Sequence, residues 1–111
     1  MAKTYDVRRL LKSSSNGGDS GGICLNETVT NLPSTTTETL IADTNINRCS
    51  LLVHNDSNKV LYLKYGSGVT STNYSIKLKG GDQAIIDKFR GQVYGVWDMI
   101  NGFAMITETT T

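Results

Sequence analysis

A short glycine-rich string near the N-terminus is the first place where this sequence could carry chemistry. Gly18-Asp19-Ser20-Gly21-Gly22 matches the residues around the nucleophile of chymotrypsin-like serine proteases. Such a nucleophile needs a histidine base and an orienting carboxylate, both held by a rigid scaffold. Here Ser20 lies in a Gly/Ser-rich stretch, and the single histidine, His54, follows it in the sequence. We therefore interpret the match as coincidence and predict that the chain is not an enzyme.

The remaining reactive groups lack partners at a suitable spacing. Cys24 and Cys49, with one histidine in the chain, do not complete a tetrahedral metal site. They could pair in an oxidising compartment, but the N-terminus has no signal-peptide core, so we expect a cytoplasmic origin and two free thiols. Asp82, Asp87 and Asp98 fall at strand ends or outward positions and are interpreted as solvated surface groups. The sequence thus predicts no catalytic residue, no metal and no cofactor.

Composition limits the classes of partner. The formal net charge is +1 and 19% of the residues are charged, so no strong field attracts nucleic acid or an anionic membrane. No apolar run approaches the length that spans a membrane. Abundant Gly, Thr, Ser and Asn with few strong helix formers favour short strands joined by tight turns. We expect a single domain that binds neither nucleic acid nor membrane.

The chain divides near residue 33. Residues 1–32 are predicted to form a flexible N-terminal arm with a Gly/Ser-rich linker at 13–22, and residues 33–111 a β-sandwich domain. Within the arm, Val7, Leu10 and Leu11 have helical spacing among basic residues. Two interpretations stay open: a disordered basic tail, or an arm that becomes ordered only when it docks on a neighbouring subunit.

Strand signals recur after residue 33 at the spacing of a sandwich or barrel. They cover residues 35–41, 48–55, 60–65, 74–79, 83–89, 92–98 and 103–108. The fold prediction is all-β, an antiparallel β-sandwich or jelly-roll-like barrel of about seven short strands with an extended N-terminal arm. We expect 48–55 to pair with 60–65, a hairpin at Asn101 and Gly102, and a sheet crossing in the loop 66–73.

Five aromatic residues allow two interpretations, a ligand-binding face or part of the core. They could line a sugar-binding face, although a domain of this size needs most of its aromatics for the core. The residues are Tyr62, Tyr65, Tyr74, Tyr94 and Trp97.

Several short strings resemble a pattern found in small phage virion proteins. The segment 48–57 resembles "R-x-x-L-x-[VI]-x-N-x-S", 61–66 resembles "LYLxxG", 74–78 resembles "YSxxL" and 91–97 resembles "GxVxGxW". The resemblance covers about residues 38–108. With its length and N-terminal arm, the chain is similar to the small capsid staple proteins of epsilon-fifteen-like short-tailed phages.

That resemblance implies a function and partners. Proteins of that family have a jelly-roll-like domain on the outside of the capsid and clamp neighbouring major capsid subunits, often as dimers about local two-fold axes. It implies a non-enzymatic virion protein, made in the bacterial host cytoplasm, whose partners are the major capsid protein and a second copy of itself. The alternative is a head-fibre or tail-associated module that binds host-surface carbohydrate.

Two sets of residues are candidates for these contacts. The basic and apolar side chains of the arm suit grooves and acidic patches on a capsid subunit; they are Val7, Arg8, Arg9, Leu10 and Leu11. The Thr-rich segment 35–41 lacks the Lys and Pro residues that often protect an exposed edge strand. Self-association is therefore predicted there, through Thr35, Thr37, Thr39 and Ile41.

Overall fold

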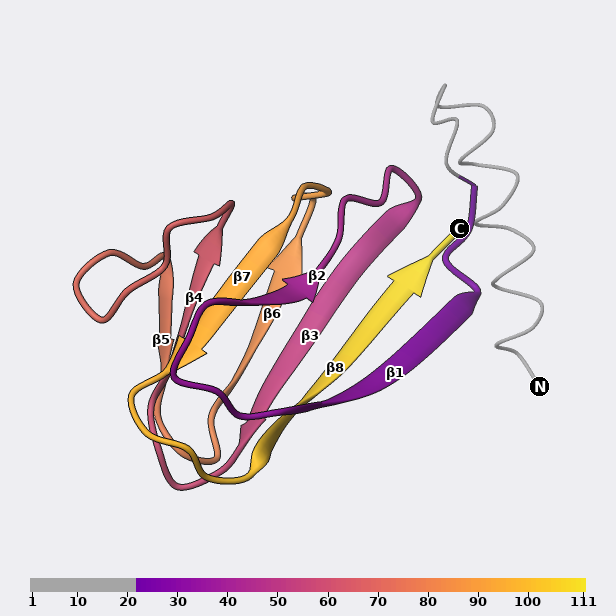
Figure 1. Cartoon of the computed structure of the whole chain (residues 1–111). Helices are drawn as coiled ribbons and strands as arrows, with labels where there is room; N and C mark the ends of the chain where they lie inside the picture. The colour runs from indigo at the N-terminus through magenta and orange to yellow at the C-terminus, as the bar shows by residue number, and fades with distance from the viewer. Residues whose placement is uncertain (1–21) are drawn as a thin grey trace.

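A computed structural model of the chain describes residues 22–111, which form eight strands in two antiparallel sheets (Figure 1). The strands are β1 (Asn26–Pro33), β2 (Thr39–Ala42), β3 (Arg48–Asp56), β4 (Leu61–Tyr65), β5 (Ile76–Leu78), β6 (Gln83–Asp87), β7 (Val93–Trp97) and β8 (Phe103–Thr110). Within these residues there is no helix long and apolar enough to span a membrane.

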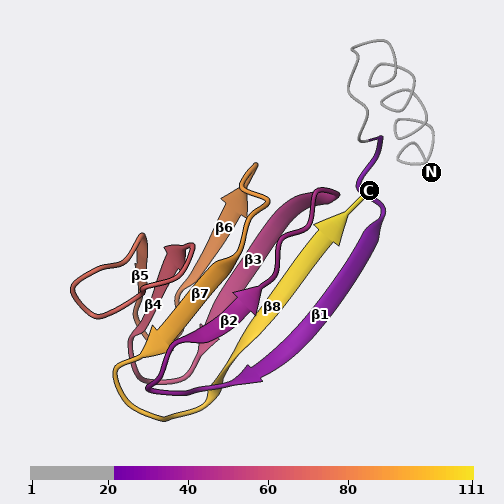
Figure 2. The ribbon, with the colours of Figure 1, turned by 45° about the horizontal axis from the view of Figure 1, so that its top comes forward.

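The strand order defines a jelly roll. One sheet has the order β1-β8-β3-β6 and the other β2-β7-β4-β5, and Figure 2 shows β1 at the edge of its sheet, beside β8. Consecutive strands therefore alternate between the sheets except at β4 and β5, which pair with each other. This arrangement belongs to the double-sheet jelly rolls. The prediction of an all-β antiparallel sandwich is confirmed.

The core lies between the sheets and follows the alternation of the strands. In β3 and β4 every second side chain is fully buried, and Leu51, Val53, Leu61 and Leu63 have no exposed surface. Since successive side chains in a strand point to opposite faces, their neighbours are directed away from the core. Trp97 of β7 is 1% exposed and is the largest fully buried side chain. The strands predicted at 48–55 and 60–65 are confirmed, but the buried face does not extend to Cys49, which is half-buried, or to Tyr65, which is 42% exposed.

Three predicted connections are wrong. The segments 48–55 and 60–65 do not pair, because β3 pairs with β6 and β8 whereas β4 pairs with β5 and β7. No hairpin forms at Asn101 and Gly102, since β7 and β8 lie in different sheets. The loop 66–73 joins the paired strands β4 and β5, so it is not a crossing between sheets. In each case a turn signal was correct, but it does not specify which sheet the next strand joins.

Strand β1 has no counterpart in the prediction. It lies before residue 33 and pairs with β8 along its whole length, from Asn26 opposite Thr110 to Pro33 opposite Phe103. Its residues are almost all exposed, so the hydrophobic alternation that reveals a strand is missing from its sequence. Its position depends on main-chain pairing with β8.

The two cysteines are joined. Cys24 lies just before β1 and Cys49 lies in β3, and a disulfide connects them with their Cα atoms 6.2 Å apart. The expectation of two free thiols is contradicted. The bond attaches the chain ahead of β1 to β3, although β8 lies between those two strands.

A buried asparagine links the sheets. Asn55 of β3 has no exposed surface, and its Nδ2 donates to the main-chain oxygens of Lys59, Leu78 and Lys79 at 2.7–3.2 Å. Its Oδ1 accepts hydrogen bonds from the Trp97 indole N–H at 3.2 Å and from the Ser57 hydroxyl at 2.7 Å. All polar atoms of this side chain have partners, as a buried amide requires.

A buried arginine closes the opposite end of the sandwich. Arg48 is 1% exposed, and its Nε donates to Glu108 Oε2 at 2.8 Å. Its terminal nitrogens donate to the main-chain oxygens of Phe89, Gly91 and Asp43. The pKa of the exposed Asp43 carboxyl lies below its ordinary value, because the Gln92 side chain and the Thr44 backbone N–H donate to it and the charge of Arg48 adds a smaller effect.

Candidate functional site

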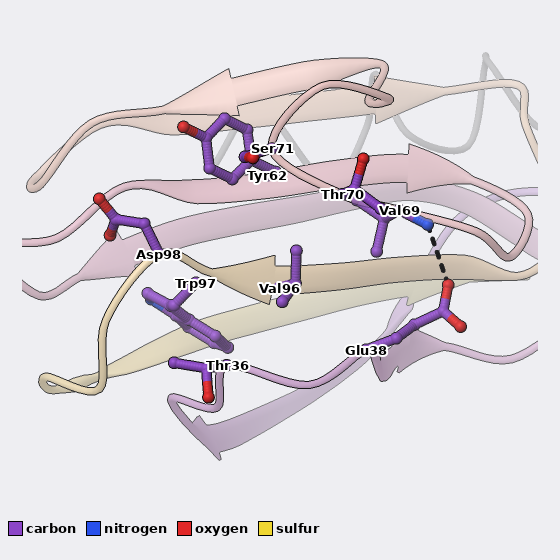
Figure 3. A pocket seen from close by; sticks show the side chains of 9 residues that line it. All are labelled: Thr36, Glu38, Tyr62, Val69, Thr70, Ser71, Val96, Trp97 and Asp98. Carbon is purple, nitrogen blue, oxygen red and sulfur yellow. Dashed lines mark hydrogen bonds between the residues drawn. The ribbon is translucent and has the colours of Figure 1, made fainter.

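A pocket of about 370 Å³ opens on the outer side of the sheet β2-β7-β4-β5. Two outward side chains of neighbouring strands, Tyr62 of β4 and Val96 of β7, line it together with loop residues. The loops supply Thr36, Glu38, Val69, Thr70, Ser71 and Asp98 (Figure 3). In Figure 3 the two carboxylates, Glu38 and Asp98, lie at opposite ends of the pocket.

Hydrogen bonds hold the walls of this pocket in place. Glu38 Oε2 accepts from the backbone N–H groups of Gly68 and Val69, the latter at 3.0 Å. Thr70 and Asn73 exchange backbone hydrogen bonds at 2.9 and 3.2 Å, which closes the tip of the loop 66–73. Asp98 Oδ1 accepts from Val60 N at 3.0 Å. Each carboxylate thus uses one oxygen for the fold, and its second oxygen makes no hydrogen bond within the described residues.

The predicted aromatic face is only partly assembled. Tyr62 lines the pocket, and its ring centroid lies 5.0 Å from that of Tyr74, which is 42% exposed. Tyr65 stacks on Phe89 with centroids 4.6 Å apart. Trp97 also borders the pocket but is 1% exposed, and its indole N–H is directed to Asn55, so it belongs to the core. Tyr65 is also 42% exposed and Tyr94 is half-buried, but neither lines the pocket, so Tyr62 is the accessible tyrosine of the predicted face that does.

An exposed apolar tip lies between β7 and β8. Met99 and Ile100, which we call the apolar tip, are 57% and 71% exposed. The residue that follows them is fixed from two sides, because Asn101 N donates to Ser34 Oγ at 2.8 Å and Asn101 Oδ1 accepts from Asn58 N at 2.9 Å. Asp98, just before them, is also held, because its N–H donates to the Val60 carbonyl at 3.0 Å, so the main chain is fixed on both sides of the two exposed side chains.

Gly102 completes the anchoring of this loop. It has φ +62°, and a Cβ there would lie 2.3 Å from the carbonyl oxygen of Asp56. Its own oxygen accepts a hydrogen bond from Ser34 N at 3.1 Å. Only glycine permits both the left-handed backbone and this close approach. The apolar tip is therefore pre-organised, and the sequence signal at Asn101 and Gly102 marks this loop even though no hairpin forms.

The other predicted site residues are dispersed. Thr39 and Ile41 lie in β2, an edge strand, whereas Thr35 and Thr37 precede it. Ile41 is 7% exposed and points into the core. The self-association edge stays a prediction. The capsid-docking residues lie outside the described part of the chain; they are Val7, Arg8, Arg9, Leu10 and Leu11.

The residues considered for catalysis are not brought together in one site either. Ser20 lies outside residues 22–111. His54 lies in β3, and its Nδ1 is buried with no hydrogen-bond partner among the described residues. Asp82 and Asp87 are exposed and do not line the pocket, whereas Asp98 does. Across residues 22–111, no group of three or more His, Cys, Asp and Glu side chains is arranged to hold a metal ion.

Comparison with known proteins adds one distant likeness. No protein-family model matches the chain, and no curated protein matches it. The structure is similar to a solved one described as "Bacillus endospore appendages form a novel family of disulfide-linked pili". The identity is 18% over 82% of this chain and 93% of that chain, with a TM-score of 0.47. A likeness this distant supports no conclusion about function.

Proposed function

We propose that this chain is a non-enzymatic virion protein that binds the outer surface of a phage capsid and clamps neighbouring major capsid subunits. The resemblance of residues 38–108 to small capsid staple proteins suggests the partner. The observation that carries the proposal is the apolar tip, where two large apolar side chains are exposed on a loop fixed by hydrogen bonds. Pre-organised apolar anchors of this kind lose little entropy on binding and dominate the affinity of protein interfaces.

Clamping also needs several contacts on one rigid body. The sandwich supplies the body, and the apolar tip and the predicted docking residues of the arm supply separate points of attachment. Contacts that are weak one by one add through effective concentration when a rigid module links them. Dimerisation on the shell would double the number of contacts and, under two-fold symmetry, use the same surface on both copies.

Replacing both residues of the apolar tip is expected to weaken capsid binding. In Met99→Ser with Ile100→Ser, loss of about 2 kcal/mol or more of contact energy corresponds to roughly 30-fold weaker binding. The measurement is co-sedimentation of the full-length protein with expanded capsids that lack it, over a range of protein concentrations. Thermal unfolding of the variant should stay close to that of the original, because both side chains are already exposed.

The matched control is Ile46→Ser. Ile46 is 78% exposed in the turn between β2 and β3, at the other end of the sandwich (Figure 1). This variant should bind as the original does. If the two variants bind equally well, the apolar tip is not the anchor. If the original protein itself shows no saturable binding, the capsid proposal is wrong.

The second candidate is binding of host-surface carbohydrate in the pocket. It is favoured by the combination of Tyr62, two carboxylates and three hydroxyl side chains, Thr36, Thr70 and Ser71, around one cavity. Sugar recognition uses such polar groups for ring hydroxyls and an aromatic face for the apolar side of the ring. On a glycan array, Tyr62→Ala should lower binding at least about tenfold, or ~1.4 kcal/mol. Tyr94→Ala, outside the pocket, is the control, and absence of any glycan signal for the original protein would reject this candidate.

A further inference from the structure

The face of the sheet β1-β8-β3-β6 that points away from the core is a defined surface. In β3 the inward residues are Leu51, Val53 and Asn55, so the residues between them point outward. Residues paired with these on neighbouring strands point the same way, so the strand register identifies the outward residues of β1, β6 and β8 as well. The central outward row, one residue from each strand, is Val29, Thr107, Leu52 and Ile85. We call this surface the outer face.

The middle of the outer face is apolar and open. Val29 is 52% exposed and Ile85 is 64% exposed, although both are strand residues with large side chains. Leu52 lies between them and is half-buried. Met105 follows in the next row, opposite Asn31 and His54. Large apolar side chains gathered on one exposed sheet face of a small domain mark a place where another segment binds.

The rim of the outer face is acidic. Glu27 and Asp87 stand at the two ends of the row that also contains Thr109 and Ser50. Asp56 stands in the row beyond Met105, opposite Phe103. The outward positions on these four strands carry no Lys or Arg. The surface therefore suits a partner with apolar side chains at its centre and positive charges around them.

We propose that, while the protein is free and not docked on a capsid, residues 7–12 of the same chain bind this outer face. That segment has three apolar side chains, Val7, Leu10 and Leu11, and three cations, which are Arg8, Arg9 and Lys12. The apolar residues match the central row, and the cations match Glu27, Asp56 and Asp87. Both the apolar and the charged parts of the segment thus have a counterpart on the face.

The connection favours the same chain as the source of the segment. Residues 13–21 link the segment to Gly22, which lies just before β1 at the Glu27 end of the face. A link of that length can extend to about 30 Å, and β6 lies only about 14 Å across the sheet from β1. A connection this short gives an effective concentration in the millimolar range. A second copy reaches that concentration only in a dense assembly.

Trypsin cleavage of the folded full-length protein tests this. Arg8, Arg9 and Lys12 are cleavage sites, and a docked segment is cut only when it leaves the face. We expect Ile85→Asp to release the N-terminal peptides about tenfold faster than the original, because a charge in the central row repels the apolar side chains. The matched control Ile46→Asp, at an exposed isoleucine off the face, should leave the rate unchanged. Mass spectrometry identifies the peptides, and circular dichroism confirms that each variant is folded.

Each outcome of the trypsin experiment either supports or overturns the inference. Slow release in the original that does not depend on protein concentration, and that rises in Ile85→Asp, supports the inference. Equal rates in the original and Ile85→Asp overturn it. Protection that appears only at high protein concentration also overturns it and indicates a second copy as the occupant. The test uses the free protein, so it is independent of capsid binding.

Discussion

Replacement of Arg48 by Met is expected to lower the free energy of unfolding by about 3–5 kcal/mol. The guanidinium is 1% exposed and donates to Glu108 and to the main-chain oxygens of Phe89, Gly91 and Asp43. Methionine fills much of the same volume but donates no hydrogen bonds. The acceptors would then lose their partners at the end of the sandwich, and leaving such groups unpaired costs more than the original contacts contribute.

The measurement is urea unfolding of the original and variant proteins, with thermal unfolding as a second probe. For a domain of 60–100 residues, 1 kcal/mol corresponds to roughly 4–8 °C, so the midpoint of thermal unfolding should fall by about 12–40 °C. Glu108→Gln is the comparison, because the amide oxygen still accepts from Arg48 Nε and Glu108 is 24% exposed. Its cost should be about 1 kcal/mol. A loss below 1 kcal/mol in Arg48→Met would contradict the role assigned to the guanidinium.

Removing the disulfide is the change with the next largest expected effect. The bond between Cys24 and Cys49 closes a loop with a sequence separation of 25, and a cross-link of that size stabilises by about 3 kcal/mol through the entropy of the unfolded chain. The double variant Cys24→Ala with Cys49→Ala should therefore unfold at a lower urea concentration than the oxidised original. Adding a reductant to the original should reproduce that shift.

The control is the same reductant added to the double variant, whose midpoint should not move. Alkylation under denaturing conditions without reductant reads the redox state directly, and the oxidised protein should incorporate no label. Incorporation of two labels would show that the thiols are free.

The strands with one buried face could be predicted from sequence, and the pairing of those strands could not. Alternation in the segments 48–55 and 60–65 identified β3 and β4 and most of their inward residues. Turn residues mark where a strand ends, but in a jelly roll the next strand usually joins the opposite sheet. That choice depends on contacts between segments far apart in the chain, such as Val53 with Ile106, which no local pattern encodes.

The buried polar residues and the pocket could not be predicted for a similar reason. Nothing in the local sequence distinguishes Arg48 and Asn55 as buried residues, because their hydrogen-bond partners come from several distant loops. Thr36 and Glu38 line the same pocket as Tyr62 and Asp98. No sequence pattern indicates that these distant residues lie together. The signal at Asn101 and Gly102 did mark the loop between β7 and β8, and the two apolar residues just before it, Met99 and Ile100, could have suggested an apolar tip.

The path of β8 has a practical consequence. It begins at Phe103, close to the apolar tip, and ends beside the start of β1, where Asn26 Nδ2 donates to the Thr111 carbonyl at 3.0 Å. The last residue is thus about 25 Å from the tip, at the other end of the molecule (Figure 1). A peptide or fluorescent reporter fused after Thr111 would project away from whatever surface the tip contacts. The protein could then carry a fused cargo without blocking the apolar tip.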